Sequence, residues 1–202
     1  MVEEQKSTEE LIFNAALSVF QRKGLAGARM QEIADEAGIN KSMLHYYFRS
    51  KELLFRQVFL MSFKQFSASI IPLLNQPVSW EEKIPLVAGH YISSMQKNPD
   101  LPLFIINELR HHPDEFVNIV THNGIRDTLF ISQLKEGIEK GEIRKIQPIQ
   151  VMVSIISETV FPFIARPMLM HMTKLLDTNW DTFIENRKEI ISEMLIKYLK
   201  EF

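Results

Sequence analysis

The sequence predicts an all-α protein of about nine helices, in which a three-helix N-terminal head precedes a larger C-terminal helical bundle. Apolar residues recur with the 3.6-residue period of a helix along most of the 202 residues. No alternating apolar run flanks a hairpin signal such as Asn-Gly, so no strand pair is expected. Residues that start and stop helices then divide the chain into its elements.

In the head, the predicted helices cover residues 7–24, 30–37 and 41–47, and a long fourth helix runs from Ser50 toward residue 74. The first helix is expected to begin at Ser7, because Glu10 stands three residues later and completes a capping box. Gly24 is expected to end it as a left-handed C-terminal cap. Pro72 and Pro77 are expected to close the fourth helix.

The C-terminal part is predicted to hold a helix over 79–97, a short apolar helix to residue 112, one long helix over 113–141, an apolar helix from residue 148 and a last helix from residue 179. Pro162 and Pro167 are expected to bend or end the apolar helix. We therefore expect two domains, residues 1–50 and 51–202, with the second the larger.

Composition narrows the class of protein. Hydrophobic residues make up 46% of the chain, which suffices for a substantial core, and the formal charge is −2. No uninterrupted apolar run reaches the ~18 residues that a membrane span requires. The acidic, polar start is not a secretory signal, and the chain has no cysteine for disulfides, thiolate metal sites or cysteine nucleophiles. We expect a cytoplasmic protein with no membrane partner.

Charge is distributed unevenly. Between Phe20 and Arg56 cations outnumber anions, although the whole chain is acidic. The cations in this stretch are Arg22, Lys23, Arg29, Lys41, Arg49, Lys51 and Arg56, and the anions are Glu32, Asp35, Glu36 and Glu52. A basic stretch is typical of a surface that meets nucleic acid, but charge alone equally fits an ordinary solvated surface.

Residues 31–54, QEIADEAGINKSMLHYYFRSKELL, have the pattern of a helix-turn-helix. Ala34 is small where two helices approach closely, and Gly38 supplies the positive φ that the turn needs. Asn40 caps the second helix, and Leu44 is its inward anchor. A short helix held in this way fits the major groove of DNA with its N-terminus first. The head is therefore predicted to be a helix-turn-helix DNA-binding domain.

This segment closely resembles the signature of the TetR/AcrR family of transcriptional regulators, roughly I-A-x-x-A-G-V-S-x-G-x-L-Y-x-Y-F-x-S-K-E-x-L. The matching residues are Ile33, Ala34, Ala37, Gly38, Ile39, Leu44, Tyr47, Phe48, Ser50, Lys51, Glu52 and Leu54. The resemblance covers about residues 8–56. It implies a ligand-responsive transcriptional regulator, most often a repressor, that binds double-stranded operator DNA as a homodimer and is released by a small effector.

The resemblance also implies which residues bind DNA: Arg29, Gln31, Lys41, Ser42, Met43, His45, Tyr46, Tyr47 and Lys51. Residues 41–43 begin the recognition helix and are expected nearest the base edges, while Lys51 is expected to hold a phosphate. His45 stands where the family usually has a phosphate-binding tyrosine. The family often has a capping threonine or serine where this chain has Arg29, so we expect the cap to be lost and the arginine to contact phosphate.

Residues 80–170 are rich in Phe, Met, Ile and Leu, with scattered polar groups. This composition favours an apolar pocket with a few polar anchors, suited to an apolar or amphipathic small molecule. The candidate lining residues are Tyr91, Phe104, Asn107, Glu108, Phe130, Glu158 and Phe161. Taken singly, each of them fits an ordinary core or surface position better, and it is the family resemblance that favours a pocket somewhere in this part of the chain.

Other classes of site have weaker support. His111 and His112 are adjacent and point to different sides of a helix, so with His122 they predict no metal site. No Ser-His-Asp, His-Glu-x-x-His or phosphate-loop spacing appears. We expect no enzyme activity and no cofactor. The alternatives are a helical lipid or small-molecule carrier, an enzyme with a vestigial head, and a protein–protein adaptor.

The last two long helices are too apolar for one small body to cover. One carries a broad apolar stripe from Trp180 to Leu199, and the segment from Ile149 to Phe163 is nearly all apolar. These stripes favour a homodimer joined through a four-helix interface about a two-fold axis. Burial within a single subunit is the alternative.

Overall fold

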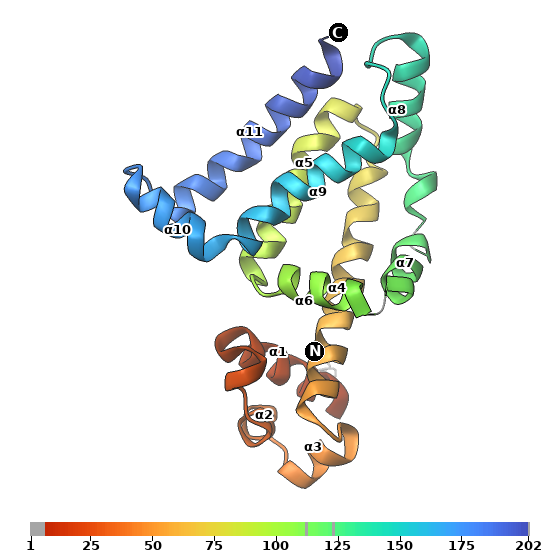
Figure 1. Ribbon diagram of the computed structural model, residues 1–202. Helices are drawn as coiled ribbons and strands as arrows, with labels where there is room; N and C mark the ends of the chain where they lie inside the picture. The colour runs from red at the N-terminus through yellow and green to blue at the C-terminus, as the bar shows by residue number, and fades with distance from the viewer. Residues whose placement is uncertain (1–6, 112, 123, 202) are drawn as a thin grey trace, which may run out of the picture. The chain divides into compact units, whose positions relative to one another are not determined.

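The computed structural model describes residues 7–111, 113–122 and 124–201. These ranges contain eleven α-helices, one short 3-10 helix and no β-strand (Figure 1). The predicted all-α class is confirmed. The helices are more numerous than expected because the helix predicted over residues 113–141 is divided and because the chain after residue 164 forms a separate helix. The chain forms two compact units, Met1–Lys64 and Gln65–Phe202.

The first unit contains α1 (Thr8–Gly27), α2 (Met30–Ala37), α3 (Lys41–Tyr47) and the beginning of α4 (Lys51–Leu74). The predicted bounds of α2 and α3 are confirmed residue for residue. Apolar side chains from all four helices share one core: Ile12, Ala16, Val19, Phe20, Ile33, Ala34, Leu44 and Leu54 are fully buried. These helices are short, so most of their stability comes from this shared burial rather than from helix propensity.

The end of α1 differs from the prediction. Ser7 and Glu10 form the expected capping box, in which the Glu10 N–H donates to the Ser7 hydroxyl oxygen over 3.2 Å. Gly24, however, has φ 64° and ψ 178° and lies inside the helix assignment, which ends at Gly27. This conformation is not the left-handed one expected of a cap. It belongs to a region that essentially only glycine adopts, and it kinks the chain without ending the helix.

The start of α4 packs within the first unit. Its cap is Ser50 as predicted, since the Ser50 hydroxyl oxygen accepts the Leu53 N–H over 3.1 Å. Phe55 meets Phe20 of α1 edge-on, with ring centroids 4.9 Å apart. Because these first turns are held by α1, the compact units divide at residue 64, inside α4. The functional boundary after residue 50 stays a prediction.

The second unit contains the rest of α4 and α5 (Trp80–Lys97), α6 (Leu101–His111), α7 (Pro113–His122), the 3-10 helix η1 (Ile125–Asp127), α8 (Leu129–Lys140), α9 (Pro148–Ile164), α10 (Arg166–Leu175) and α11 (Trp180–Lys200). Helices α5, α9 and α11 pack against one another (Figure 1). Ser79 and Glu82 form the predicted capping box of α5.

Two predicted helices of this unit are built differently. The single long helix expected over residues 113–141 is divided into α7, η1 and α8, because Gly124 adopts a left-handed conformation with φ 69°. Pro162 does not end the apolar helix, which continues to Ile164 as α9. Instead the chain bends by 80° between α9 and α10, and Pro167 lies in the first turn of α10.

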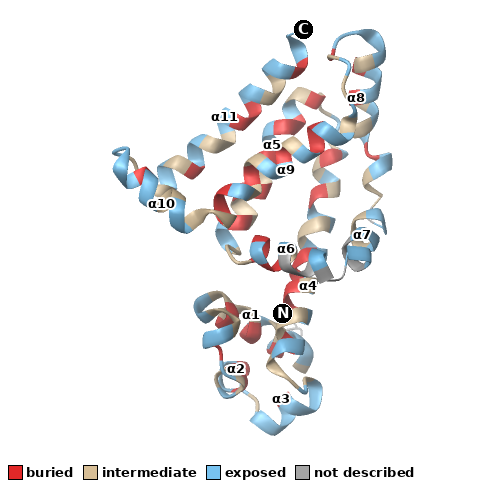
Figure 2. Cartoon of the chain, viewed as in Figure 1, coloured by how far each residue is buried: buried red, intermediate tan, exposed pale blue. Residues whose placement is uncertain are grey.

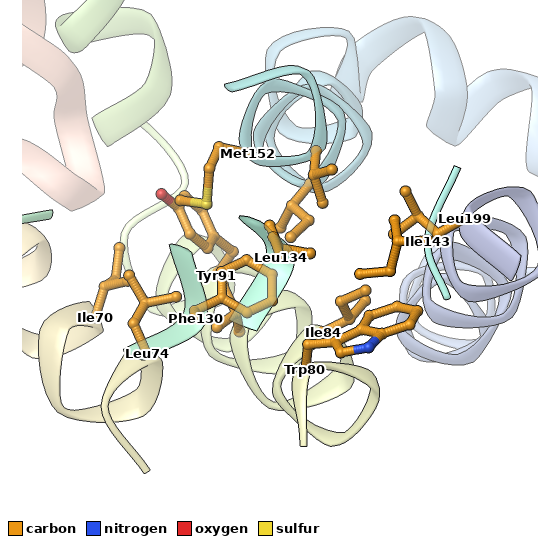
Figure 3. Close-up of a cluster of buried hydrophobic side chains, with 13 residues drawn as sticks. Ile70, Leu74, Trp80, Ile84, Tyr91, Phe130, Leu134, Ile143, Met152 and Leu199 are labelled. Carbon is orange, nitrogen blue, oxygen red and sulfur yellow. The ribbon is translucent and has the colours of Figure 1, made fainter. Parts of the chain in front are cut away.

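The core of the second unit is one cluster of buried side chains contributed by α4, α5, α8, α9, α11 and the segment before α9 (Figure 3). Its members are Ile70, Leu74, Trp80, Ile84, Val87, Tyr91, Phe130, Leu134, Ile143, Val151, Met152, Ile155 and Leu199. We call this set the interior cluster. It is apolar apart from the phenol of Tyr91 and the indole N–H of Trp80.

Apolar side chains also lie on the surface of this unit. Figure 2 shows exposed residues along one side of both α9 and α11, with buried residues along the other. The exposed apolar residues are Ile149, Val153, Ile156 and Phe161 on α9 and Ile190, Met194 and Tyr198 on α11. We call these the α9 and α11 stripes. Ile184, Ile191 and Leu199 of α11 are buried instead.

By length and composition alone, α4 could cross a membrane, and α9 with α10 could do so if the bent pair formed one span. The most apolar window of α4 has a mean hydropathy of 1.2, and 33% of it is buried inside the protein. The core helix of a water-soluble protein passes the same test, so one or two such helices are weak evidence for a membrane span.

Candidate nucleic-acid interface and interior ligand site

Helices α2 and α3 are joined by a tight turn that fixes the angle of α3. Gly38 has φ 70° and ψ 26°, and the following Ile39 N–H donates to the Ala34 carbonyl over 3.0 Å. Asn40 then caps α3, because its side-chain oxygen accepts the Met43 N–H over 2.7 Å. Leu44 is fully buried and anchors α3 to the core. The arrangement is a helix-turn-helix, as the sequence predicts.

The rest of α3 faces solvent. Every residue of α3 that was predicted to bind DNA is exposed, namely Lys41, Ser42, Met43, His45, Tyr46 and Tyr47. Tyr46 is 84% exposed, and its ring lies edge-on to that of Tyr47 with centroids 5.7 Å apart. The first turn of α3 and its aromatic side chains are therefore accessible within the first unit.

Two cations of the basic stretch form ion pairs with carboxylates of α2. Arg22 donates two hydrogen bonds to the carboxylate of Glu36, with the closest N–O distance 2.5 Å, and Lys23 pairs with Glu32 at 2.7 Å. The hydrogen bond from Arg22 is the main reason that the pKa of Glu36 lies below its ordinary value. These pairs tie α1 to α2 and offset the negative charges of Glu32 and Glu36.

Other cations remain free. Arg29, Lys41 and Arg49 are exposed, and their side chains form no ion pair with any residue in the described part of the chain. The loop between α3 and α4 carries Arg49, which was counted in the basic stretch but not predicted to bind DNA. Its position directly after the recognition helix was the signal that could have identified it.

Two predicted DNA contacts have partners within the first unit. The Gln31 amide donates to the Asp35 carboxylate over 2.7 Å. The Lys51 ammonium donates to the Ala28 carbonyl over 3.1 Å, which ties the start of α4 to the segment before α2. An ammonium has three N–H donors, so a phosphate contact by Lys51 stays compatible with this bond.

The sequence was compared with families and with individual proteins. Residues 12–58 match the family model described as bacterial regulatory proteins, tetR family. The regulator RutR of Escherichia coli K12 is 28% identical, with 69% of this chain and 91% of RutR covered. The repressor NicS of Pseudomonas putida is 30% identical over 108 residues, which are 52% of this chain and 49% of NicS.

The N-terminal part of this chain is therefore similar to the bacterial regulatory proteins of the tetR family. The matched residues run from α1 into α4 and include the whole helix-turn-helix. The fold of the whole chain also resembles a solved structure, that of the transcriptional regulator FadR of Bacillus subtilis in complex with stearoyl-CoA. The TM-score is 0.63, with 20% identity, and 95% of this chain and 99% of that chain are covered.

In the second unit, Tyr91 and Phe130 both belong to the interior cluster (Figure 3). Phe104 of α6 is buried but lies outside that cluster. The side chains of Asn107 and Glu108, which were predicted to supply polarity, lie outside the described residues. Of the predicted ligand residues, the structure thus places Tyr91 and Phe130 in one buried cluster.

Glu158 and Phe161 are not part of the interior cluster. The carboxylate of Glu158 pairs with Arg187 of α11, and this arginine also donates to the Glu158 carbonyl over 3.2 Å. Phe161 is 55% exposed on the α9 stripe.

A shallow hollow of about 370 Å³ between α8 and α9 contains none of the predicted ligand residues; it is lined by Lys135, Ile138, Glu139, Lys145, Ile146, Gln147 and Pro148.

A hydrogen bond between a histidine and a serine was not predicted. The His90 Nε2 atom lies 2.7 Å from the Ser69 hydroxyl oxygen, and that hydroxyl is also 2.7 Å from the Phe66 carbonyl, to which it donates. When the serine proton goes to the Phe66 carbonyl, the hydroxyl oxygen accepts from the His90 tautomer that is protonated at Nε2. Among the described residues, no three histidine or carboxylate side chains gather as metal ligands; the side chain of His111 and the whole of His112 lie outside them.

Proposed function

We propose that this protein is a ligand-responsive transcriptional repressor of the cytoplasm, in which residues 1–50 bind operator DNA and residues 51–202 bind the effector and dimerise. The observation that carries the proposal is the exposed first turn of α3, capped by Asn40 and anchored by Leu44. Such a helix enters a major groove with its N-terminus first. The similarity to the tetR family supports the same role.

In this proposal the residues of the interface contact different parts of the DNA. Lys41, Ser42 and Met43 meet base edges, and the thioether of Met43 offers an apolar contact suited to a thymine methyl group. Arg29 and Arg49 neutralise phosphates on either side of the recognition helix. The exposed side chains that follow on α3, His45 to Tyr47, meet the sugar–phosphate backbone and flanking bases.

A homodimer is proposed through the α9 and α11 stripes. Large exposed apolar patches on a soluble chain mark interaction sites, and stripes on two adjacent helices suit a four-helix interface between copies. Two recognition helices spaced about 34–36 Å apart meet successive major grooves on one face of DNA. Pairing of two copies supplies that spacing.

The effector is proposed to be apolar or amphipathic and to bind the second unit. The structure of FadR, which has the same fold, contains stearoyl-CoA, a molecule with a long apolar chain. A ligand that binds better to a dimer whose two DNA-binding heads are wrongly spaced for the operator shifts the population away from the DNA-bound state. A coupling free energy of about 1–3 kcal/mol changes operator affinity about 5- to 150-fold. Helix α4 belongs to both units and is the proposed lever.

The test is operator binding measured by fluorescence anisotropy, over a range of salt concentrations, on DNA from upstream of the protein's own gene. Arg29→Ala and Arg49→Ala are each expected to weaken binding on all DNA sequences and to flatten the salt slope by about 0.9 per lost phosphate contact. Lys135→Ala removes an exposed cation of α8 and is the matched control, expected to leave the slope unchanged.

Equal salt slopes for the wild type and both arginine variants would exclude these residues from the phosphate contacts. Absence of any salt-dependent binding to duplex DNA by the wild type would contradict the regulator itself. Lys51→Ala separates the two roles of that lysine: a lower unfolding temperature with an unchanged slope assigns it only to the bond with Ala28.

A further inference from the structure

Helix α10 is amphipathic, and its apolar side points away from its own subunit. Met168, Met172 and Leu175 follow the helical spacing i, i+4 and i+7, so they lie on one side of α10. These side chains are 54%, 44% and 69% exposed, and Leu176, which follows the helix, is 73% exposed. We call Met168, Met172 and Leu175 the α10 face.

The subunit itself covers little of α10. Of its ten residues, all of which the structure describes, only Thr173 is buried, while Leu169 and Met170 are partly buried and hold the helix to the subunit. Isolated helices shorter than about 12–15 residues are marginal in water and depend on packing of an apolar side. An exposed apolar side at helical spacing is typical of a helix that packs on another chain.

The α10 face continues the apolar surface of the α9 and α11 stripes. Helix α10 joins α9 to α11 and packs against both (Figure 2). Phe161 of the α9 stripe lies shortly before the 80° bend that leads into α10. A standard interface takes about 20–30 residues from each partner. The two stripes contain seven exposed apolar residues, so a stable pair of copies needs further surface, and α10 supplies it beside them.

The charges around this surface suit a second copy. Helix α10 carries Arg166, His171 and Lys174 and no carboxylate. Glu189 and Glu193 of α11 are exposed and form no ion pair within the part of the chain that the structure describes. Pairing of two copies brings cations and carboxylates to one interface. An anionic lipid surface, which also attracts basic amphipathic helices, would be repelled by these carboxylates.

We propose that the α10 face is covered by a second copy of this chain and forms one end of the dimer interface. This inference rests on the proposed function, because it extends the interface proposed there from the α9 and α11 stripes to α10. Interfaces between proteins have an apolar core and a charged rim. Met172, in the middle of the α10 face, therefore lies in the buried part of the contact, and Lys174 lies at its rim.

Because this chain has no cysteine, a single introduced thiol reports on its own surroundings. Met172→Cys, Met194→Cys and Leu86→Cys place one thiol in the full chain, on the α10 face, on the α11 stripe and on α5. The rate of modification by a thiol reagent is measured over a range of protein concentrations. Met172→Cys is expected to react at least about tenfold more slowly once copies pair, because only the free copy exposes its thiol.

Leu86→Cys is the matched control. Leu86 is 41% exposed, close to the 44% of Met172, and it lies outside the α10 face and both stripes. Its thiol is expected to react at the same rate at every protein concentration.

A charge on the α10 face tests the same contact without a reagent. Met172→Glu is expected to raise the dimer dissociation constant about tenfold or more in light scattering, because it places a carboxylate in an apolar interface. Met172→Leu keeps the side chain apolar and is expected to associate like the wild type. Since Met172 is exposed within one copy, both variants are expected to keep the helix content of the wild type in circular dichroism.

The outcomes separate this inference from the proposed function. A Met172→Cys thiol that reacts equally fast at all concentrations, while Met194→Cys becomes protected, would overturn the inference and leave the dimer through the stripes. Protection of Met172→Cys alone would support the contact of α10 and exclude the stripes. Protection of neither thiol would overturn both. Protection of Met172→Cys by anionic lipid vesicles, at a dilution where the chain is monomeric, would assign the α10 face to a membrane and overturn the inference.

Discussion

At the scale of single residues, the interior contains a lysine where an apolar residue would be expected. Lys83 is fully buried on α5, and its ammonium donates to the Gln133 side-chain oxygen. The Gln133 amide in turn donates to the Val78 carbonyl over 2.8 Å. The two hydrogen bonds of Gln133 therefore link α8 to the segment before α5. Burial lowers the pKa of Lys83, which means that the folded state disfavours its charge.

Replacing this lysine tests the cost of the buried charge. Because the pKa of Lys83 is lower in the folded state, the cost is fully present below the folded pKa and disappears as pH rises through the unfolded value of about 10.4. Lys83→Met is expected to unfold with equal or greater free energy at pH 7, by up to about 1–4 kcal/mol. Its advantage over the wild type is expected to shrink toward pH 10.

Urea unfolding at both pH values measures the difference. Lys135→Met, which changes an exposed lysine of α8, is the control and is expected to show no such pH dependence. An advantage of Lys83→Met that stays constant between pH 7 and pH 10 would mean that the pKa of Lys83 is not lowered in the folded protein.

At the scale of helices, the sequence allowed helix starts and short-range turns to be predicted. It did not allow prediction of where a long helix is interrupted. Capping by Ser7, Asn40 and Ser79 depends on residues within three positions, so the sequence contains the whole signal. Glycine is ambiguous: Gly89 lies within α5, whereas Gly124 breaks a predicted helix. Packing against the rest of the unit decides between these outcomes, and local sequence does not carry that information.

Gly24 provides a test at this scale. Its φ of 64° with ψ of 178° is strained for any side chain, although a Cβ there would meet no neighbouring atom. Gly24→Ala is expected to destabilise the protein by about 1–3 kcal/mol through backbone strain alone. Gly89→Ala is the control, since it is helical and has open space, and it is expected to stabilise by up to about 1 kcal/mol.

Both variants are compared with the wild type by thermal unfolding followed by circular dichroism. A Gly24→Ala protein that unfolds at the wild-type temperature would show that the backbone at this position relaxes into an ordinary helical conformation.

At the scale of the whole molecule, the sequence predicted which helices are apolar but not which side of each helix faces the core. Phe130 and Phe161 were equal candidates for a ligand site, yet the first is fully buried and the second lies on the α9 stripe. Similarly, Ile190 and Ile191 are neighbours in one predicted stripe, but only Ile191 is buried. A helix that is apolar on two sides hides its orientation, because the periodic pattern is satisfied by either side.

The exposed stripes predict how copies associate. Met194→Glu places a charge in the middle of the α11 stripe, and it is expected to raise the dimer dissociation constant at least about 30-fold, the effect of one hot-spot residue. Light scattering at several concentrations measures the mass, and circular dichroism checks that helix content is kept. Operator affinity is expected to fall in parallel.

Leu86→Glu is the matched control, because Leu86 is exposed to a similar extent on α5 and belongs to neither stripe. A Met194→Glu protein with the mass and operator affinity of the wild type would move the interface elsewhere or exclude a dimer.

The start of α2 has a consequence for engineering. Arg29 stands at the capping position and makes no capping hydrogen bond with its side chain, so the chain forgoes the roughly 1 kcal/mol that aspartate or serine would contribute. A selection for heat resistance alone would favour aspartate at this position. In the proposed interface the same change replaces a phosphate-binding cation with a carboxylate, so the more stable variant is expected to bind DNA more weakly.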